Sequence, residues 1–222
     1  MPFYDNMLEL IENDDLEECK KHYYSIHYTR VQNIDELNKS VFNKLNNKYP
    51  LYTSSEHANA IIHSIKKGKF DILKWLVCEI DSDLSILNYG RLFNISCISH
   101  YFDISKWLYE NNTEAIKSCK YVNEFEYRLF EEILYKEDLD FNDWFLDKFP
   151  HLIDSLDIET FSTLCYKKKL QSAIWLSNKR PDIIEHMSSK HAYRKETIKE
   201  ICVGGDVDMM KWFVNLVKDE DE

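Results

Sequence analysis

Five short phrases decide the fold: KFDILKWLV at 69–77, YFDISKWLY at 101–109, LDFNDWFLD at 139–147, LQSAIWLSN at 170–178 and VDMMKWFVN at 207–215. Each contains one of the five tryptophans, and successive tryptophans lie 32, 37, 31 and 37 residues apart. An apolar residue lies five positions before each Trp and another directly follows it, which is typical of one wide apolar face of a helix. A recurrence of this length predicts a repeated helical unit.

A second apolar face precedes each phrase, fourteen and ten residues before the Trp, where the spacing makes the two residues i, i+4 neighbours on a helix. The positions fourteen before are Ile61, Phe93, Phe130, Phe161 and Ile198, and the positions ten before are Ile65, Cys97, Leu134, Cys165 and Cys202. Only the short turns KKGK, SHY, KED, KKK and GGD separate the two faces. We therefore predict a helix, a tight turn and an antiparallel helix in every unit, with the five Trp residues buried at equivalent positions of the second helices.

Composition agrees with an all-α protein. The chain has 222 residues and only four Gly and four Pro, too few for most turn-rich β architectures. Its net charge of −11 disfavours a uniformly basic surface for nucleic acid. No leader or membrane-spanning pattern is evident, and the six cysteines are scattered singly, so we expect a cytoplasmic chain with reduced thiols.

The repeat frame predicts the domain organisation. In the opening segment Lys21 takes the place of the Trp, and such a polar position is expected of a terminal cap. We assign capping helices and a connector to 1–53 and a continuous array of repeats to 54–222. The repeats are placed at about 54–88, 89–124, 125–156, 157–193 and 194–222.

Three segments carry a resemblance to a known family: SIKKGKFDILKWLV at 64–77, SCISHYFDISKWLY at 96–109 and CVGGDVDMMKWFV at 202–214. Their register resembles the second half of the ankyrin repeat. With Trp at a leucine position and many Asn, Ile, Lys and Tyr residues, the chain is similar to divergent ankyrin proteins of large DNA viruses of amoebae. The Thr-Pro-Leu-His tetrapeptide of typical ankyrin units is missing, so short helices or loops are expected in place of projecting β-hairpins. A generic α-solenoid is the alternative fold.

The sequence shows no constellation typical of catalysis. Cys97, Cys165 and Cys202 share one register on the first helices, which predicts packing, and neither a C-x-x-C pair nor an H-E-x-x-H motif is present. Gly204 and Gly205 fall in a turn between helices and lack the context of a phosphate loop. We expect no enzymatic activity, no cofactor and no metal.

Two basic clusters stand out at the turns of the first and fourth repeats. They are Lys66, Lys67 and Lys69, and Lys167, Lys168 and Lys169. Such lysines commonly only solubilise a turn, but in a stacked array the clusters would share an edge suited to an acidic partner. The resemblance implies a protein-binding scaffold, with a host protein as partner if the viral likeness holds. The alternatives are a nucleic-acid-directed protein, by binding or by acidic mimicry, and a solenoid subunit of a larger assembly.

Overall fold

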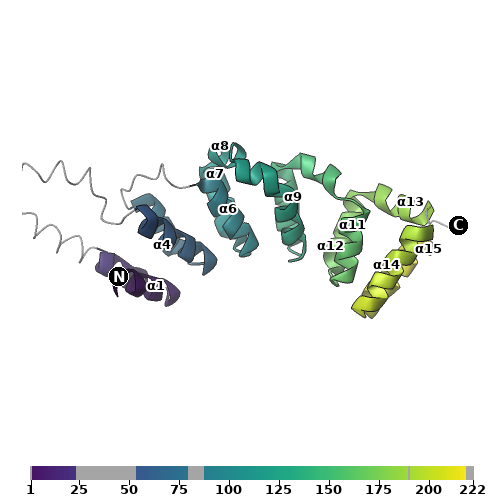
Figure 1. The fold of residues 1–222 in the computed structure, drawn as a ribbon, viewed down its shortest axis with the longest axis horizontal. Helices are drawn as coiled ribbons and strands as arrows, with labels where there is room; N and C mark the ends of the chain where they lie inside the picture. Colours follow the sequence, from purple (N-terminus) through teal and green to yellow (C-terminus); the bar gives the residue numbers. More distant parts are fainter. Residues whose placement is uncertain (1, 24–53, 80–87, 190, 219–222) are drawn as a thin grey trace, which may run out of the picture. The chain divides into compact units, whose positions relative to one another are not determined.

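The computed structural model describes residues 2–23, 54–79, 88–189 and 191–218, and all regular secondary structure in these ranges is helical. The predicted all-α class is confirmed. The chain divides into two compact units, 1–122 and 123–222. The division falls inside one helix, close to the boundary predicted between the second and third repeats. Figure 1 shows the helices of each unit.

The N-terminal unit contains the cap and two helix pairs. The cap consists of α1 (Pro2–Glu12) and a second helical segment at 16–23. The next pair is α4 (Ser54–Lys66) and α5 (Phe70–Lys74), which continues as the π-helical segment η1 (Trp75–Glu79). The last pair is α6 (Tyr89–Ile98) and α7 (Phe102–Asn111), followed by the short helix α8 (Thr113–Lys117). α1 packs against α4, and α4 packs against α6.

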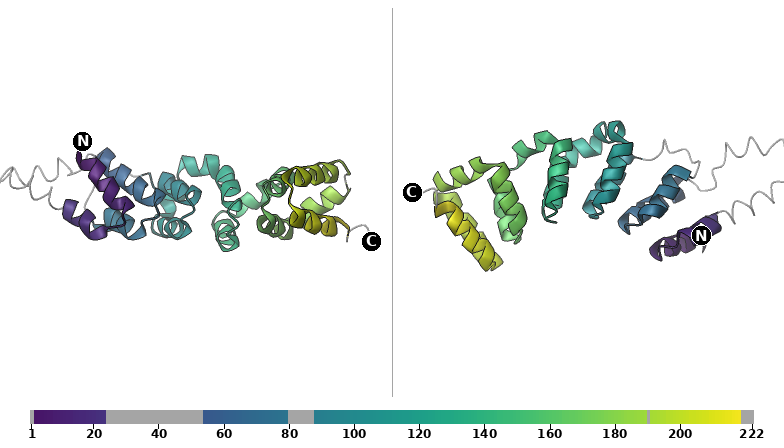
Figure 2. Two further views of the ribbon diagram at one scale, coloured as in Figure 1. Left: turned by 90° about the horizontal axis from the view of Figure 1, so that it is seen from below. Right: turned by 180° about the vertical axis from the view of Figure 1, so that it is seen from behind.

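The C-terminal unit contains three helix pairs. The first is α9 (Lys120–Leu134) with α10 (Leu139–Lys148), followed by the 3-10 helix η3 (Pro150–Ser155). The second is α11 (Ile158–Tyr166) with α12 (Leu170–Lys179), followed by α13 (Pro181–Ser189). The third is α14 (His191–Gly204) with α15 (Val207–Lys218), which lie side by side in Figures 1 and 2. Short helices thus occupy the connectors at α8, η3 and α13.

Each turn between paired helices has the same backbone geometry. One residue in each turn has a positive φ, between 60° and 71°, and it lies seven positions before the Trp of its unit, or before Lys21 in the cap. These residues are Asp14, Gly68, His100, Glu137, Lys168 and Gly205. In the turn at Gly68, its N–H donates to the Ile65 carbonyl and the Lys69 N–H donates to the Ser64 carbonyl, which is the Schellman pattern at a helix C-terminus.

Four of these six positive-φ residues are not glycine. The scarcity of glycine is therefore compatible with tight turns, because Asp, His, Glu and Lys accept the left-handed conformation here at a modest energetic cost. This shared backbone position was not identified from the sequence. The cap has the same positive-φ position, which is occupied by Asp14.

The tryptophans lie on the second helix of each pair, as predicted, but they are not equally buried. Trp75 and Trp175 are buried, whereas Trp107, Trp144 and Trp212 are half-buried. Inside the units, several of these rings contact an aromatic ring of the preceding helix pair, with centroids 5.6–6.1 Å apart. The contacts are Tyr23 with Trp75, Phe70 with Trp107, Phe130 with Trp175 and Phe161 with Trp212. These four tryptophans thus pack their helices against the preceding pair, whereas Trp144 stacks on Phe141 of its own helix.

Polar contacts also join first helices in the C-terminal unit. The hydroxyl groups of Tyr127 on α9 and Thr160 on α11 lie 2.9 Å apart, as do those of Ser162 on α11 and Thr197 on α14. Asp157 caps α11 by accepting the Thr160 N–H at 3.0 Å. Thr160 therefore takes part both in the N-terminal cap of α11 and in the contact with the first helix of the preceding pair.

Candidate interaction surfaces

The first predicted lysine cluster lies where the first full helix pair meets the cap. Lys66 is the last residue of α4, and Lys67 and Lys69 flank the positive-φ residue of the turn. The Lys67 Nζ atom lies 2.9 Å from Glu12 Oε1, and the Lys69 Nζ atom lies 3.5 Å from Asp14 Oδ2. The hydrogen bond from Lys67 lowers the pKa of Glu12. Two of the three lysines thus join the turn to the cap.

The second predicted cluster has a similar arrangement in the other unit. The Lys169 Nζ atom lies 4.0 Å from Glu137 Oε2, and the Glu137 carboxylate also accepts the N–H of Gln171 at 3.0 Å. The Lys167 Nζ atom lies 4.6 Å from the centre of the Tyr135 ring. Lys168 is exposed and occupies the positive-φ position.

A common rule underlies these contacts. The positive-φ residue of one turn faces the residue directly after the positive-φ position in the next turn. Asp14 pairs with Lys69 and Glu137 pairs with Lys169 in this way. Gly68 follows the same rule, because a Cβ atom at this position would lie 2.2 Å from the Tyr101 ring. The residues of a turn therefore differ between units partly because each must be compatible with the residue that it faces in the next turn.

Three of the six predicted lysines remain for an external partner. Lys66, Lys167 and Lys168 are exposed and form no ion pair with any residue that the structure describes. A recurring position, nine residues before the Trp, is Lys66 in the first repeat and carries exposed apolar side chains in three others. It exposes Ile98 by 53%, Tyr166 by 50% and Val203 by 68%, and Lys167 and Lys168 directly follow Tyr166. We call Lys66 and Ile98 of the N-terminal unit, and Tyr166, Lys167, Lys168 and Val203 of the C-terminal unit, the turn-edge residues of the two units.

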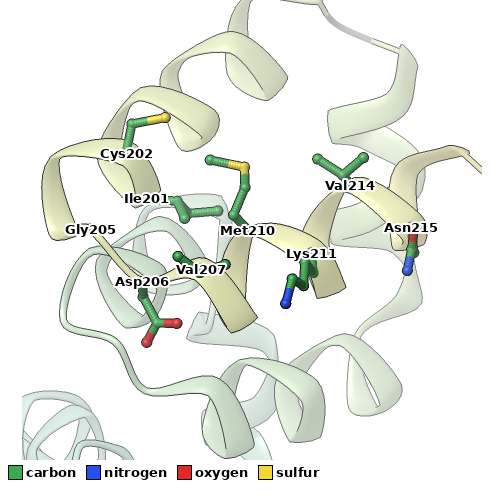
Figure 3. A pocket seen from close by; sticks show the side chains of 9 residues that line it. All are labelled: Ile201, Cys202, Gly205, Asp206, Val207, Met210, Lys211, Val214 and Asn215. Carbon is green, nitrogen blue, oxygen red and sulfur yellow. The ribbon is translucent and has the colours of Figure 1, made fainter.

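A different surface lies on the last helix pair. An open groove of about 540 Å³ lies between α14 and α15. Figure 3 shows its lining, with Cys202 on one side and Met210 and Val214 on the other. Val207 contributes a further apolar side chain, 65% exposed. Asp206 and Lys211 bring one charge of each sign to the rim. We call this surface the C-terminal face.

Two residues of the C-terminal face occupy register positions that are buried in the preceding helix pairs. Ten residues before the Trp, Ile65, Cys97, Leu134 and Cys165 are fully buried, but Cys202 is exposed. Two residues before the Trp, Leu73, Ser105, Asn142 and Ala173 are fully buried, but Met210 is only half-buried. The prediction that Cys202 is a core residue is therefore wrong. No helix pair follows α15 among the described residues to cover it.

The cysteines that are buried are poor candidates for nucleophiles. Burial raises the pKa of Cys19 to about 11 and that of Cys97 to about 12, and it raises the pKa of Cys165 as well. These thiols stay protonated at neutral pH, whereas a nucleophilic cysteine needs a lowered pKa. No group of three or more His, Cys, Asp or Glu side chains in the described ranges could hold a metal ion. Gly205 lies in a turn, as predicted, and Gly204 ends α14.

The chain was compared with family models, with curated proteins and with solved structures. Nothing matched in any of the three. Among the helices that the structure describes, none is both long enough and apolar enough to cross a membrane. A function for the chain can therefore be inferred only from its turn-edge residues and its C-terminal face.

The lysine clusters can be identified from the sequence, but the C-terminal face was not predicted. The repeat pattern does contain a sign of this face. The cap has Lys21 at the position of the Trp, whereas the last unit keeps apolar Met210 and Val214 beside its Trp. A last unit with apolar residues at stacking positions predicts an uncovered apolar surface. The acidic partners of Lys67, Lys69 and Lys169 could not be identified from the sequence, because they lie at the preceding turn and the contacts between turns are seen only in the structure.

Proposed function

We propose that the chain is a non-enzymatic scaffold that binds another protein, built as an ankyrin-like solenoid of antiparallel helix pairs. The shared positive-φ turn and the contacts between Trp and the preceding pair support this architecture within each unit. The short connector helices α8, η3 and α13 replace the β-hairpins of typical ankyrin units. Repeat arrays of this kind present extended surfaces suited to recognition.

The observation that carries the proposal is the repeated exposure of apolar side chains at the turn edge. Three units expose Ile98, Tyr166 and Val203 at one register position, although apolar side chains gain from burial. Scattered single apolar residues on a surface need no explanation, but a recurrence at one position beside free lysines favours a binding edge. Tyrosine is also enriched in protein interfaces.

The free lysines indicate the chemistry of the partner. Lys66, Lys167 and Lys168 would face an acidic patch and would raise the association rate more than the affinity. The resemblance to viral ankyrin proteins makes a host protein the proposed partner, bound in the cytoplasm. With a net charge of −11 on the whole chain, an acidic partner must approach the turn edge and not the remaining surface.

The test compares two sets of substitutions in affinity capture from an extract of host cells. The turn-edge variant carries Ile98→Ser and Tyr166→Ser, and the control carries Glu110→Ser and Asn178→Ser at exposed positions of second helices. We expect the native chain and the control to retain the same partner and the turn-edge variant to lose it, with circular dichroism unchanged. Loss from the control alone would show that the proposed edge is wrong. Salt-sensitive binding to duplex DNA in place of a protein would favour the nucleic-acid alternative.

A matched pair of lysine variants separates recognition from stacking. Replacing Lys66 and Lys168 with Ser should leave the melting temperature unchanged and slow association with the captured partner. Replacing Lys67, Lys69 and Lys169 with Ser should instead lower the melting temperature, because these lysines pair with acids of the preceding turn. If the first set leaves the association rate unchanged, the lysines have no role in recognition.

A further inference from the structure

The C-terminal face has the chemistry of an internal packing surface. Two of its residues, Cys202 and Met210, occupy positions that are buried in earlier units, and Val214 also lines the groove. Val207 lies beside them and is 65% exposed. Inside the unit, α14 packs against α11 of the preceding pair, as the contact between Ser162 and Thr197 illustrates. The C-terminal face therefore continues an interface that already exists inside the unit.

The other end of the chain does not offer a matching surface. The groove on the cap has mainly polar and charged lining residues. They include Asn6, Glu9, Asn13, Glu18 and Lys21. A cap of this composition disfavours head-to-tail contact between copies, because charged groups would lose water against an apolar groove without gaining partners.

The C-terminal face is, in contrast, complementary to itself. It combines apolar side chains in the groove with charges of both signs on the rim, Asp206 and Lys211, and Asp208 pairs with Lys211 beside it. The Lys211 Nζ atom lies 3.7 Å from Asp208 Oδ1, and both side chains are largely exposed. About a two-fold axis, the lysine of one copy can meet an aspartate of the other, and the apolar grooves cover each other.

We propose that the C-terminal face binds the same face of a second copy of this chain, giving a two-fold symmetric dimer. Stable protein interfaces bury roughly 1,200–2,000 Å² in total. The few side chains of one helix pair form a small interface, so the dimer is weak and depends on protein concentration. This inference is independent of the turn edge, since a dimer can form whether or not a partner binds there.

The first test is sedimentation equilibrium of the full chain over a wide range of concentration. The average mass should rise from the 26.7 kDa of the single chain towards twice that value and no further. A mass of 26.7 kDa at every concentration would overturn the proposal. Growth beyond the dimer would also overturn it, because it would indicate head-to-tail association.

The variant Val207→Glu tests the surface itself. It should raise the dimer dissociation constant by about tenfold or more, because it places an unpaired carboxylate in each half of the interface. The change lies in the first turn of α15, where an acidic residue suits the helix, so folding should persist. The matched control is Asn178→Glu, which places a carboxylate at an exposed position of α12 in the same unit. Equal loss of dimer in both variants would contradict the assignment.

Thiol labelling gives a second readout that needs no substitution. Cys202 and Cys78 are both exposed, but only Cys202 lies in the groove. Maleimide labelling of Cys202 should slow as the dimer fraction rises, while labelling of Cys78 stays constant. If Cys202 reacts at the same rate in the monomer and the dimer, the interface lies elsewhere.

Discussion

Replacing Trp175 with Ala tests how the helix pairs of the C-terminal unit hold together. The indole is only 6% exposed and packs edge-on against Phe130 of the preceding pair, with ring centroids 6.1 Å apart. Its Nε1–H group donates to Asp143 Oδ1 at 3.0 Å, and the Lys179 Nζ atom lies 2.8 Å from the same oxygen. One side chain thus makes an apolar and a polar contact with the preceding pair.

The expected loss of stability follows from these contacts. A buried aromatic side chain removes about 150–250 Å² from water, worth roughly 4–6 kcal/mol at about 25 cal/mol per Å². The compact unfolded chain already covers part of this area, and Ala keeps one carbon atom. The hydrogen bond adds about 1 kcal/mol, since Asp143 is partly exposed to water. We therefore expect Trp175→Ala to lower the free energy of unfolding by about 3–5 kcal/mol.

The assay is urea unfolding followed by far-ultraviolet circular dichroism, with Trp144→Ala as the matched control. Trp144 is half-buried and stacks on Phe141 of its own helix with centroids 5.1 Å apart. Its removal should cost about 1–2 kcal/mol less than that of Trp175, because less area is uncovered. A loss below about 1 kcal/mol for Trp175→Ala, or equal losses for both variants, would refute the reasoning.

Three further predictions concern the turns, pH and the thiols. Gly68→Ala should destabilise the chain more than Gly205→Ala, because both strain a positive φ but only the first meets the Tyr101 ring, and urea midpoints will compare them. The hydrogen bond from Lys179 lowers the pKa of Asp143, so its stabilising effect is complete above pH 3.8 and lost as pH falls towards the lowered pKa. Asp143→Asn should flatten that part of the stability–pH curve. Under denaturing conditions six thiols should react with maleimide, and in the native chain two classes should differ in rate, Cys78 and Cys202 fast and Cys19, Cys97 and Cys165 slow.

Local patterns predicted the helices well. The spacing around each Trp located the second helices, and the apolar pairs before it located the first helices. These signals are reliable because helix periodicity and apolar burial act within a few residues of the chain.

Properties that depend on neighbouring units could not be read in the same way. The shared positive-φ position carries Asp, His, Glu, Lys or Gly, so residue type does not reveal it. The partners of Lys67 and Lys69 lie in the cap, far away in the sequence. Cys202 resembles Cys165 in register, but it is exposed because none of the described helices packs over it.

The central claim is that successive helix pairs stack through their tryptophans, and nuclear Overhauser effects between aromatic protons test it most directly. With Trp and Phe side chains selectively labelled, cross-peaks should connect rings of adjacent pairs. The expected cross-peaks join Trp107 to Phe70, Trp175 to Phe130 and Trp212 to Phe161. If every indole showed cross-peaks only within its own helix pair, the stacked arrangement would be contradicted.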